Sequence, residues 1–198
     1  MSSPIILASG SKIRAKILSD ADIPFKVISK PVDEGSIKAS MLAENARIRD
    51  IADALAEAKS IRVSKNTSGL VIGADQIMTM DGELFDKPIS IEAARERLLA
   101  MRGKSHKLIG AMVISENGHA VWRHISVVTL QVREFSNEWL ENYIKAEGDL
   151  MTKSVGAYRF EGRGDQLFTK VDGDSYSIMG LSLLPLLDYL RTRGAILS

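Results

Sequence analysis

The chain contains no cysteine. This absence excludes disulfides, zinc sites built on thiolates and cysteine nucleophiles. Long apolar runs are also missing: none approaches the roughly 18 residues that a membrane span requires. The first residues, MSSPIILASGS, have no basic segment before their short apolar run, which argues against a signal peptide. The sequence therefore predicts a cytoplasmic protein without a membrane partner.

An excess of charge of one sign is lacking as well. The chain has 26 Lys and Arg against 25 Asp and Glu, a formal net charge of +1. No strong field attracts nucleic acid, and basic and aromatic residues are not interleaved as they are in nucleic-acid-binding modules. We expect no nucleic-acid partner. His106, His119 and His124 show no metal-ligand spacing, and there is no Walker, G-x-S-x-G or G-x-G-x-x-G motif.

What remains is an ordinary globular composition. The 198 residues are 45% hydrophobic and 26% charged, which suits one domain over residues 1–198 with a substantial core. Helical and strand patterns alternate without a strict βαβ repeat, and Asp81-Gly82 and Asn117-Gly118 are hairpin signals. We predict an α/β fold: a mixed, bent sheet with helices on its faces and two lobes around a central cleft.

Local patterns predict individual elements. Strands are expected at Pro4–Ala8, Phe25–Ser29, Gly69–Met80, Glu83–Phe85, His106–Ser115, Gly118–Arg133 and Leu167–Val171. Helices are expected after the caps Ser11, Ser90 and Ser136, over Ser40–Ile61 and over Leu183–Leu190, while Pro31–Ser36 and Lys153–Gly164 are expected to be irregular.

The turn after the first strand could bind an anion. Ser9 and Ser11 place hydroxyls beside the free N–H groups at a helix start, which is a natural anion site. Arg14 can lean back over the same spot and grip phosphate bidentately. A serine N-cap followed by a surface arginine explains the same residues without any ligand.

Asp75 is the second candidate. It follows the apolar run Leu70–Ile72, where an aspartate destabilises a strand unless it is paired or binds a cation. The small Gly73 and Ala74 leave room for a ligand beside it. A turn aspartate after a strand is the alternative.

Four more charged residues have ordinary explanations when taken singly. Glu34 lies in a polar segment, and Lys59 lies at the edge of a helical apolar stripe, where a lysine usually snorkels. Lys87 precedes Pro88, which keeps it extended, and Glu161 lies in a glycine-rich loop that could let backbone approach a ligand.

Taken together and in order, these segments resemble the Maf family of nucleoside triphosphate pyrophosphatases. The matching segments, which run nearly end to end, are Leu7–Leu18, Asp33-Glu34, Lys59, Val71–Asp75, Lys87-Pro88, Gly103–His106, Gly156–Gly162 and Gly180–Leu183. The resemblance implies a fold like that of Maf and inosine-triphosphatase proteins, a homodimer, and hydrolysis between the α- and β-phosphates of a nucleotide.

The resemblance also implies residue roles. Asp75 would accept the proton of water, with Glu34 as its companion. A divalent cation, Mg²⁺ or Mn²⁺, would be held by Glu34 and Asp75. The phosphates would be bound by Ser9, Ser11, Arg14, Lys59 and Lys87, and the base would be chosen by Ile13, Gln76 and Glu161.

Departures from the family pattern bear on the substrate. Lys12 and Ile13 replace the usual Pro-Arg, and Ser182 replaces a proline. Gln76 and Glu161 look more like the 7-methyl-GTP branch than the dTTP/UTP branch, whereas Ile13 stands where the former usually has tryptophan. Two alternatives stay open: a dTTP/UTP pyrophosphatase, and a nucleotide-binding regulator of cell division or septum formation with little turnover.

Overall fold

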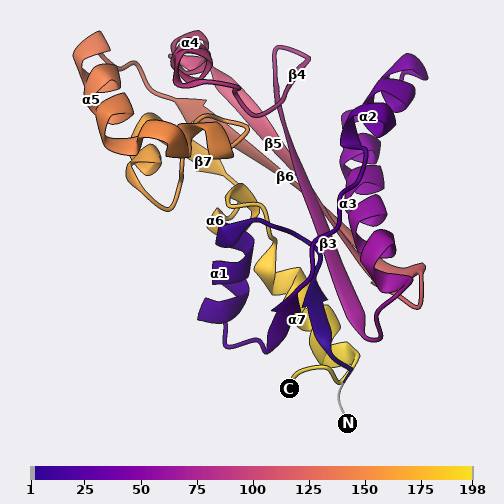
Figure 1. The fold of residues 1–198 in the computed structure, drawn as a ribbon. Helices are drawn as coiled ribbons and strands as arrows, with labels where there is room; N and C mark the ends of the chain where they lie inside the picture. Colours follow the sequence, from indigo (N-terminus) through magenta and orange to yellow (C-terminus); the bar gives the residue numbers. More distant parts are fainter. Residues whose placement is uncertain (1–2, 198) are drawn as a thin grey trace. The chain divides into compact units, whose positions relative to one another are not determined.

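The computed structural model describes residues 3–197 and shows one mixed, seven-stranded sheet. The strand order is β2-β1-β3-β5-β6-β7, and β4 pairs with β3 (Figure 1). The strands are β1 (Ile5–Leu7), β2 (Phe25–Val27), β3 (Leu70–Met80), β4 (Glu83–Phe85), β5 (Ser105–Glu116), β6 (His119–Val132) and β7 (Phe168–Asp172). The helices are α1 (Lys12–Asp20), α2 (Glu34–Ala43), α3 (Ile48–Ser64), α4 (Ile91–Met101), α5 (Asn137–Glu147), α6 (Ser175–Ile178) and α7 (Leu183–Thr192). The predicted mixed α/β class is confirmed.

The chain divides into two compact units. The first runs up to Gln76 and adds Gly110–Ser126 and the segment from Gly180 onward; the second comprises Ile77–Ile109 and Val127–Met179. Strands β3, β5 and β6 contribute residues to both units.

The first unit is built on parallel pairing. Strand β1 pairs in parallel with both β2 and β3, with Ile5 opposite Leu70 and Leu7 opposite Ile72. All of β1 and the first six residues of β3 are buried. Because consecutive residues of a strand point to opposite faces, both strands are covered on their two faces there. Helix α3 packs on β3, where Val63 and Val71 share a hydrophobic cluster.

The second unit is built on antiparallel pairing. Asp81 and Gly82, both with positive φ, turn β3 into β4, with Met80 opposite Glu83. Strand β7 pairs antiparallel with β6 from Thr129 to Val132. A hydrophobic cluster of its own fills this unit, and it includes Leu98, Leu130 and Tyr158.

Most local predictions are confirmed, but two are wrong. The predicted helix Ser40–Ile61 is two helices, α2 and α3, because Asn45 takes a left-handed φ of 55° and interrupts the ladder. The predicted turn Pro31–Ser36 contains the start of α2, since Asp33 is its N-cap and accepts a hydrogen bond from the Ser36 N–H at 3.0 Å. Helix α6 and short 3-10 segments at Gly148–Lys153 and Arg163–Leu167 complete the chain.

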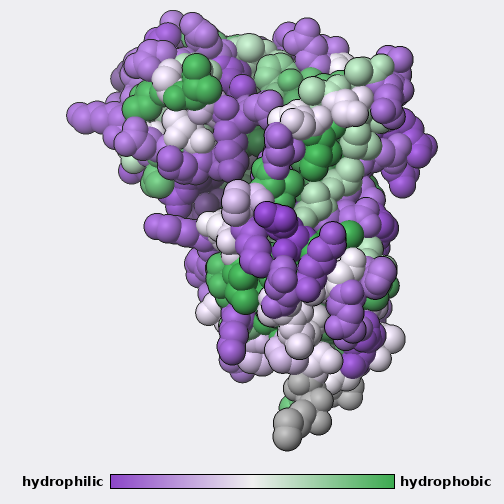
Figure 2. All heavy atoms as spheres, turned by 45° about the vertical axis from the view of Figure 1, so that its right-hand side comes forward, coloured by the Kyte–Doolittle hydropathy of each residue, from purple (hydrophilic) through white to green (hydrophobic). Residues whose placement is uncertain are grey.

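The surface is mixed in polarity. Figure 2 shows a largely hydrophilic face interrupted by smaller hydrophobic areas. Within residues 3–197, no helix has both the length and the hydropathy for crossing a membrane.

Replacing Gly73 by alanine tests the contact between β3 and α3. A Cβ at Gly73 would lie 2.1 Å from the Ala56 carbonyl oxygen and 2.7 Å from the Ser60 nitrogen, both backbone atoms of α3. We expect Gly73→Ala to lower the free energy of unfolding by about 1–3 kcal/mol, because helix backbone must move. Urea denaturation measures it. Gly10→Ala is the control, since no heavy atom lies within 4 Å of its Cβ; equal midpoints for the two variants would contradict the packing described.

His106 makes stability depend on pH. Its Nε2 lies 2.8 Å from the Tyr158 hydroxyl, and burial lowers the pKa of His106 from 6.5 to about 4. The unfolded chain therefore binds the proton first. The stabilisation is complete above pH 6.5 and is lost as the pH falls from 6.5 to 4, by about 3 kcal/mol. Unfolding of His106→Gln should lack this slope, whereas the exposed control His119→Gln should retain it. Parallel profiles for wild type and His106→Gln would exclude His106 as the cause.

Candidate functional site

Asp75 lies inside strand β3, not in a turn after it. Alternate residues of a strand face the same side, so Val71, Gly73 and Asp75 share one face. Gly73 contacts α3 on that face, and Asp75 is directed to the same helix. The room predicted beside Gly73 for a ligand is therefore filled by the backbone of α3, which is a correction.

Lys59 of α3 meets Asp75. Its Nζ lies 2.6 Å from Asp75 Oδ1 and 3.0 Å from Glu34 Oε1. The Lys59 side chain is 17% exposed and that of Asp75 is 10% exposed. Lys59 thus does not snorkel to solvent, which corrects the ordinary explanation of this position.

Glu34 reaches Lys59 from the first residue of α2. Asp33 caps that helix, accepting hydrogen bonds from the Ser36 N–H and, at 2.8 Å, from the Ser36 hydroxyl. These bonds lower the pKa of Asp33. The two acidic residues therefore have different contacts: Asp33 fixes the start of α2, and the carboxylate of Glu34, whose side chain is 45% exposed, pairs with Lys59.

Two carboxylates facing one ammonium leave the cluster of Glu34, Lys59 and Asp75 with a formal charge of −1. A buried carboxylate needs a partner, and Lys59 supplies it for Asp75. The excess negative charge also acts on Arg14: burial lowers the pKa of Arg14, and the charges of Asp75 and Glu34 oppose that shift.

Arg14 joins the start of α1 to two other segments. Its Nε donates to the Gly180 carbonyl at 2.8 Å, and its Nη1 donates to the Ala74 carbonyl at 2.8 Å and to Ser9 Oγ at 3.2 Å. The residue is thereby fixed beside Asp75. Because Nε and Nη1 bind protein acceptors, a phosphate contact would use Nη2, and the predicted bidentate grip is not available through the occupied nitrogens.

Ser9 and Ser11 form the turn as predicted. Ser11 is the N-cap of α1 and accepts from the Arg14 N–H at 3.4 Å. Ser9 Oγ accepts from the Ser11 N–H at 3.3 Å. Both hydroxyl protons are therefore left for another acceptor.

Of the predicted base-selecting residues, Ile13 and Gln76 belong to this unit. Ile13 is half-buried in the first turn of α1. Gln76 follows Asp75 in β3, and a Cβ added to Gly180 would lie 3.7 Å from Gln76 Oε1 and 3.3 Å from Arg14 Nη2. Gly180, which has a φ of 90°, thus lets Arg14 and Gln76 approach the same backbone.

Lys87 and Glu161 belong to the second unit. Lys87 is exposed between β4 and α4. Glu161 lies in the loop after Tyr158, and its Oε1 accepts a hydrogen bond from Arg159 Nε at 3.2 Å. Arg159 was not predicted; its position two residues from Glu161 in a glycine-rich loop was the available signal.

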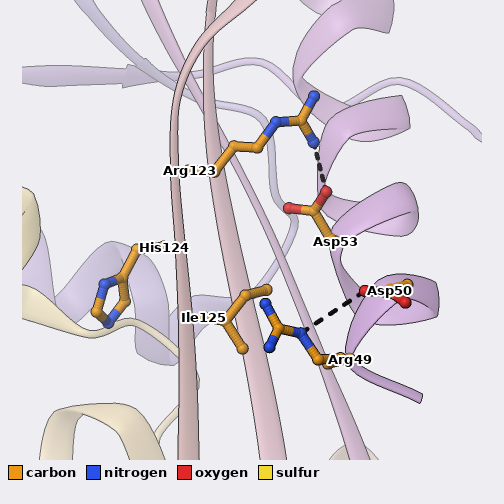
Figure 3. Close-up of a pocket in the computed structure, with 6 residues that line it drawn as sticks. All are labelled: Arg49, Asp50, Asp53, Arg123, His124 and Ile125. Atoms are coloured by element: carbon orange, nitrogen blue, oxygen red, sulfur yellow. Dashed lines mark hydrogen bonds and ion pairs between the residues drawn. The ribbon is translucent and has the colours of Figure 1, made fainter. Parts of the chain in front are cut away.

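The first unit also has an open surface pocket at α3 and β6, lined by Arg49, Asp50, Asp53, Arg123, His124 and Ile125. Figure 3 shows Arg123 directed to Asp53 and Arg49 to Asp50, with His124 pointing away from both pairs. None of the predicted site residues lines this pocket. Its acidic and basic side chains pair with one another, so it is distinct from the predicted phosphate site.

The donor set fits a divalent cation only in part. In the described chain, no group of three or more His, Asp or Glu side chains is arranged to hold a metal ion. Glu34 and Asp75 offer two carboxylates on one cluster. Mg²⁺ is commonly held by one or two carboxylates together with substrate phosphates, and these two residues suit that manner of binding.

Known proteins are similar to this chain over almost its whole length. The profile of a family described as Maf-like protein matches residues 4–193. The chain is 48% identical to a nucleoside triphosphate pyrophosphatase of Caulobacter vibrioides, covering 98% of this chain and 97% of that protein. It is 45% identical to a nucleoside triphosphate pyrophosphatase of Ruegeria pomeroyi, and 42% identical to a 7-methyl-GTP pyrophosphatase of Brucella abortus, each over 99% of both chains. The chain therefore belongs to the family of Maf-like proteins.

Proposed function

We propose that this chain is a nucleoside triphosphate pyrophosphatase, which hydrolyses its substrate to a nucleoside monophosphate and pyrophosphate. The observation that carries the proposal is the cluster of Glu34, Lys59 and Asp75, with Arg14 fixed beside it. It combines a buried carboxylate, a second carboxylate and two cationic side chains, which are the groups that phosphoryl chemistry requires. Full-length relatives named for this activity support it.

Each residue has a defined task in this reaction. Lys59 contacts Asp75 Oδ1, so Oδ2 is the oxygen that would accept a proton from the attacking water. Lys59 and Lys87 would offset phosphate charge, and Arg14 would do so through Nη2. The hydroxyls of Ser9 and Ser11 would donate to phosphate oxygens at the start of α1.

A divalent cation, Mg²⁺ or Mn²⁺, would be held by Glu34 and Asp75 together with substrate phosphates. When bound, it would supply charge neutralisation and polarisation of the phosphoryl oxygens.

The proposed substrate is a guanine-type or modified nucleotide such as 7-methyl-GTP, whose removal would be a house-cleaning task. Glu161 could accept hydrogen bonds from the N1–H and the exocyclic amine of a guanine edge. A uracil or thymine edge presents one donor between two carbonyls, and a carboxylate there would face unpaired acceptors. The relative named 7-methyl-GTP pyrophosphatase is consistent with this choice. A dTTP/UTP pyrophosphatase remains the alternative. Ile13 provides no aromatic surface for a cationic methylated base, and it matches the pattern of neither branch.

The wider setting follows the family resemblance. We infer that residues 1–198 act as one domain, in the cytoplasm, as a homodimer, without nucleic-acid or membrane partners. Strand β7 pairs with β6 from Thr129 to Val132, and no other strand of residues 3–197 pairs with that edge of β6. A second copy could therefore pair with the earlier part of β6. Sedimentation velocity measures the oligomeric state directly.

Removing the carboxylate of Asp75 tests the mechanism. Asp75→Asn keeps the shape of the side chain and leaves Glu34 beside Lys59, so we expect the fold and nucleotide binding to persist while pyrophosphate release falls by about 100-fold or more. The control is Asp20→Asn, which breaks an exposed pair with Lys16 at 2.7 Å. Near-wild-type turnover of Asp75→Asn would remove Asp75 from the role of proton acceptor. Substantial turnover of the wild-type protein in the absence of divalent metal would argue against the cation.

Changing Glu161 tests the choice of base. A glutamine can accept and also donate, so Glu161→Gln should shift the preference from guanine toward pyrimidine nucleotides. The measurement is kcat/KM for GTP, 7-methyl-GTP, UTP and dTTP. Glu141→Gln, which alters an exposed pair with Arg95, is the matched control. An unchanged substrate profile in Glu161→Gln would refute the assigned base contact.

A further inference from the structure

Arg159 connects two carboxylates of the second unit. Its Nε lies 3.2 Å from Glu161 Oε1, and its Nη1 lies 3.2 Å from Glu147 Oε2. Two different nitrogens of one planar guanidinium are therefore used, each on a separate acid. The two contacts, through Nε and Nη1, fix the orientation of the Arg159 guanidinium.

Glu147 is the fixed end of the arrangement. It is the last residue of α5, and its side chain is only 6% exposed. A carboxylate so deeply buried requires a cationic partner. Burial would lower the pKa of Arg159, but the hydrogen bonds and charges of Glu161 and Glu147 outweigh it and raise that pKa. Arg159 thus stays charged and anchored.

The loop that carries Glu161 is wrapped around Arg159. The Arg159 carbonyl accepts hydrogen bonds from the Gly162 N–H at 3.2 Å and the Gly164 N–H at 3.0 Å. A Cβ at Gly164 would lie 2.4 Å from that carbonyl oxygen, and one at Gly162 would lie 3.3 Å from Glu147 Oε1. Gly164 is therefore needed for the loop to close on this arginine, whereas a Cβ at Gly162 would only press on the end of the Glu147 side chain.

We propose that Arg159, anchored by Glu147, is a positioning residue that orients Glu161 for recognition of a guanine-type base. The inference rests on the proposed function, because it takes Glu161 as the base-selecting residue. Arg159 contacts one oxygen of Glu161, and the Glu161 side chain is 26% exposed. Oε2 and a second lone pair of Oε1 are left for two donors on a base edge, such as the N1–H and exocyclic amine of guanine. Without Arg159 the carboxylate would lose its preferred orientation, and selectivity would fall more than hydrolysis.

The test is a double-mutant cycle on base selectivity. The ratio of kcat/KM for GTP to that for UTP is measured for wild type, Arg159→Gln, Glu161→Gln and the double variant. We expect Arg159→Gln to lower the ratio about tenfold, as expected for loss of a charge-assisted hydrogen bond, with kcat for UTP little changed. In the Glu161→Gln background, Arg159→Gln should change the ratio no further.

Controls separate orientation from folding. Arg163→Gln removes the same charge from the same loop at an exposed residue, and it should leave the ratio unchanged. Arg159→Lys keeps a cation for Glu147 but cannot place two nitrogens on two acids, so it should also lower the ratio. This variant replaces Arg159→Gln in the test if Arg159→Gln fails to fold.

The outcomes distinguish this inference from the function on which it rests. If Glu161→Gln leaves the ratio unchanged, the base-selecting role of Glu161 fails and the inference fails with it. If Glu161→Gln changes the ratio but Arg159→Gln and Arg159→Lys do not, only the positioning role is overturned. If Arg159→Gln lowers kcat/KM equally for GTP and UTP, both in the wild-type and in the Glu161→Gln background, Arg159 is merely structural. That result also overturns the positioning role.

Discussion

The ion pair between Lys59 and Asp75 is the interaction on which the candidate site depends. It places a charged carboxylate inside a strand that is otherwise apolar, where it would be costly without a cation. The pair forms only because Gly73 lets α3 lie against β3, since any side chain there would meet the backbone of α3. Glu34 then extends the pair to a cluster with one more carboxylate than cations, and that excess charge suits a metal-bound triphosphate.

Of the three departures from the family pattern, Ile13 is one of the residues that would choose the base, whereas Lys12 and Ser182 are not. Glu34, Lys59 and Asp75, which would act on the phosphates, are all retained and meet in one cluster. Ile13 and Gln76 lie in the same unit, whereas Glu161 is held in the other unit by Arg159. Under the proposed roles, the residues that would act on the phosphates and the base-selecting Glu161 therefore rest on different contacts.

Sequence alone predicts the features that depend on neighbouring residues. Ser11, Ser90 and Ser136 cap helices because each side chain bonds an N–H three residues ahead. Periodicity failed at Asn45, where the apolar pattern continues across a break made by one left-handed residue. The candidate site residues were predicted through the ordered resemblance. Their contacts were not, because Lys59 meets Asp75 across 16 positions of the chain and Arg14 meets Gly180 across 166.

The most direct measurement is a phosphorus NMR spectrum of the products formed from GTP with Mg²⁺. Attack between the α- and β-phosphates should give GMP and pyrophosphate as the first products, and EDTA should abolish both resonances. Formation of GDP and orthophosphate would contradict the assignment of this cluster to pyrophosphate release. So would the absence of hydrolysis for GTP and for every other nucleoside triphosphate tried.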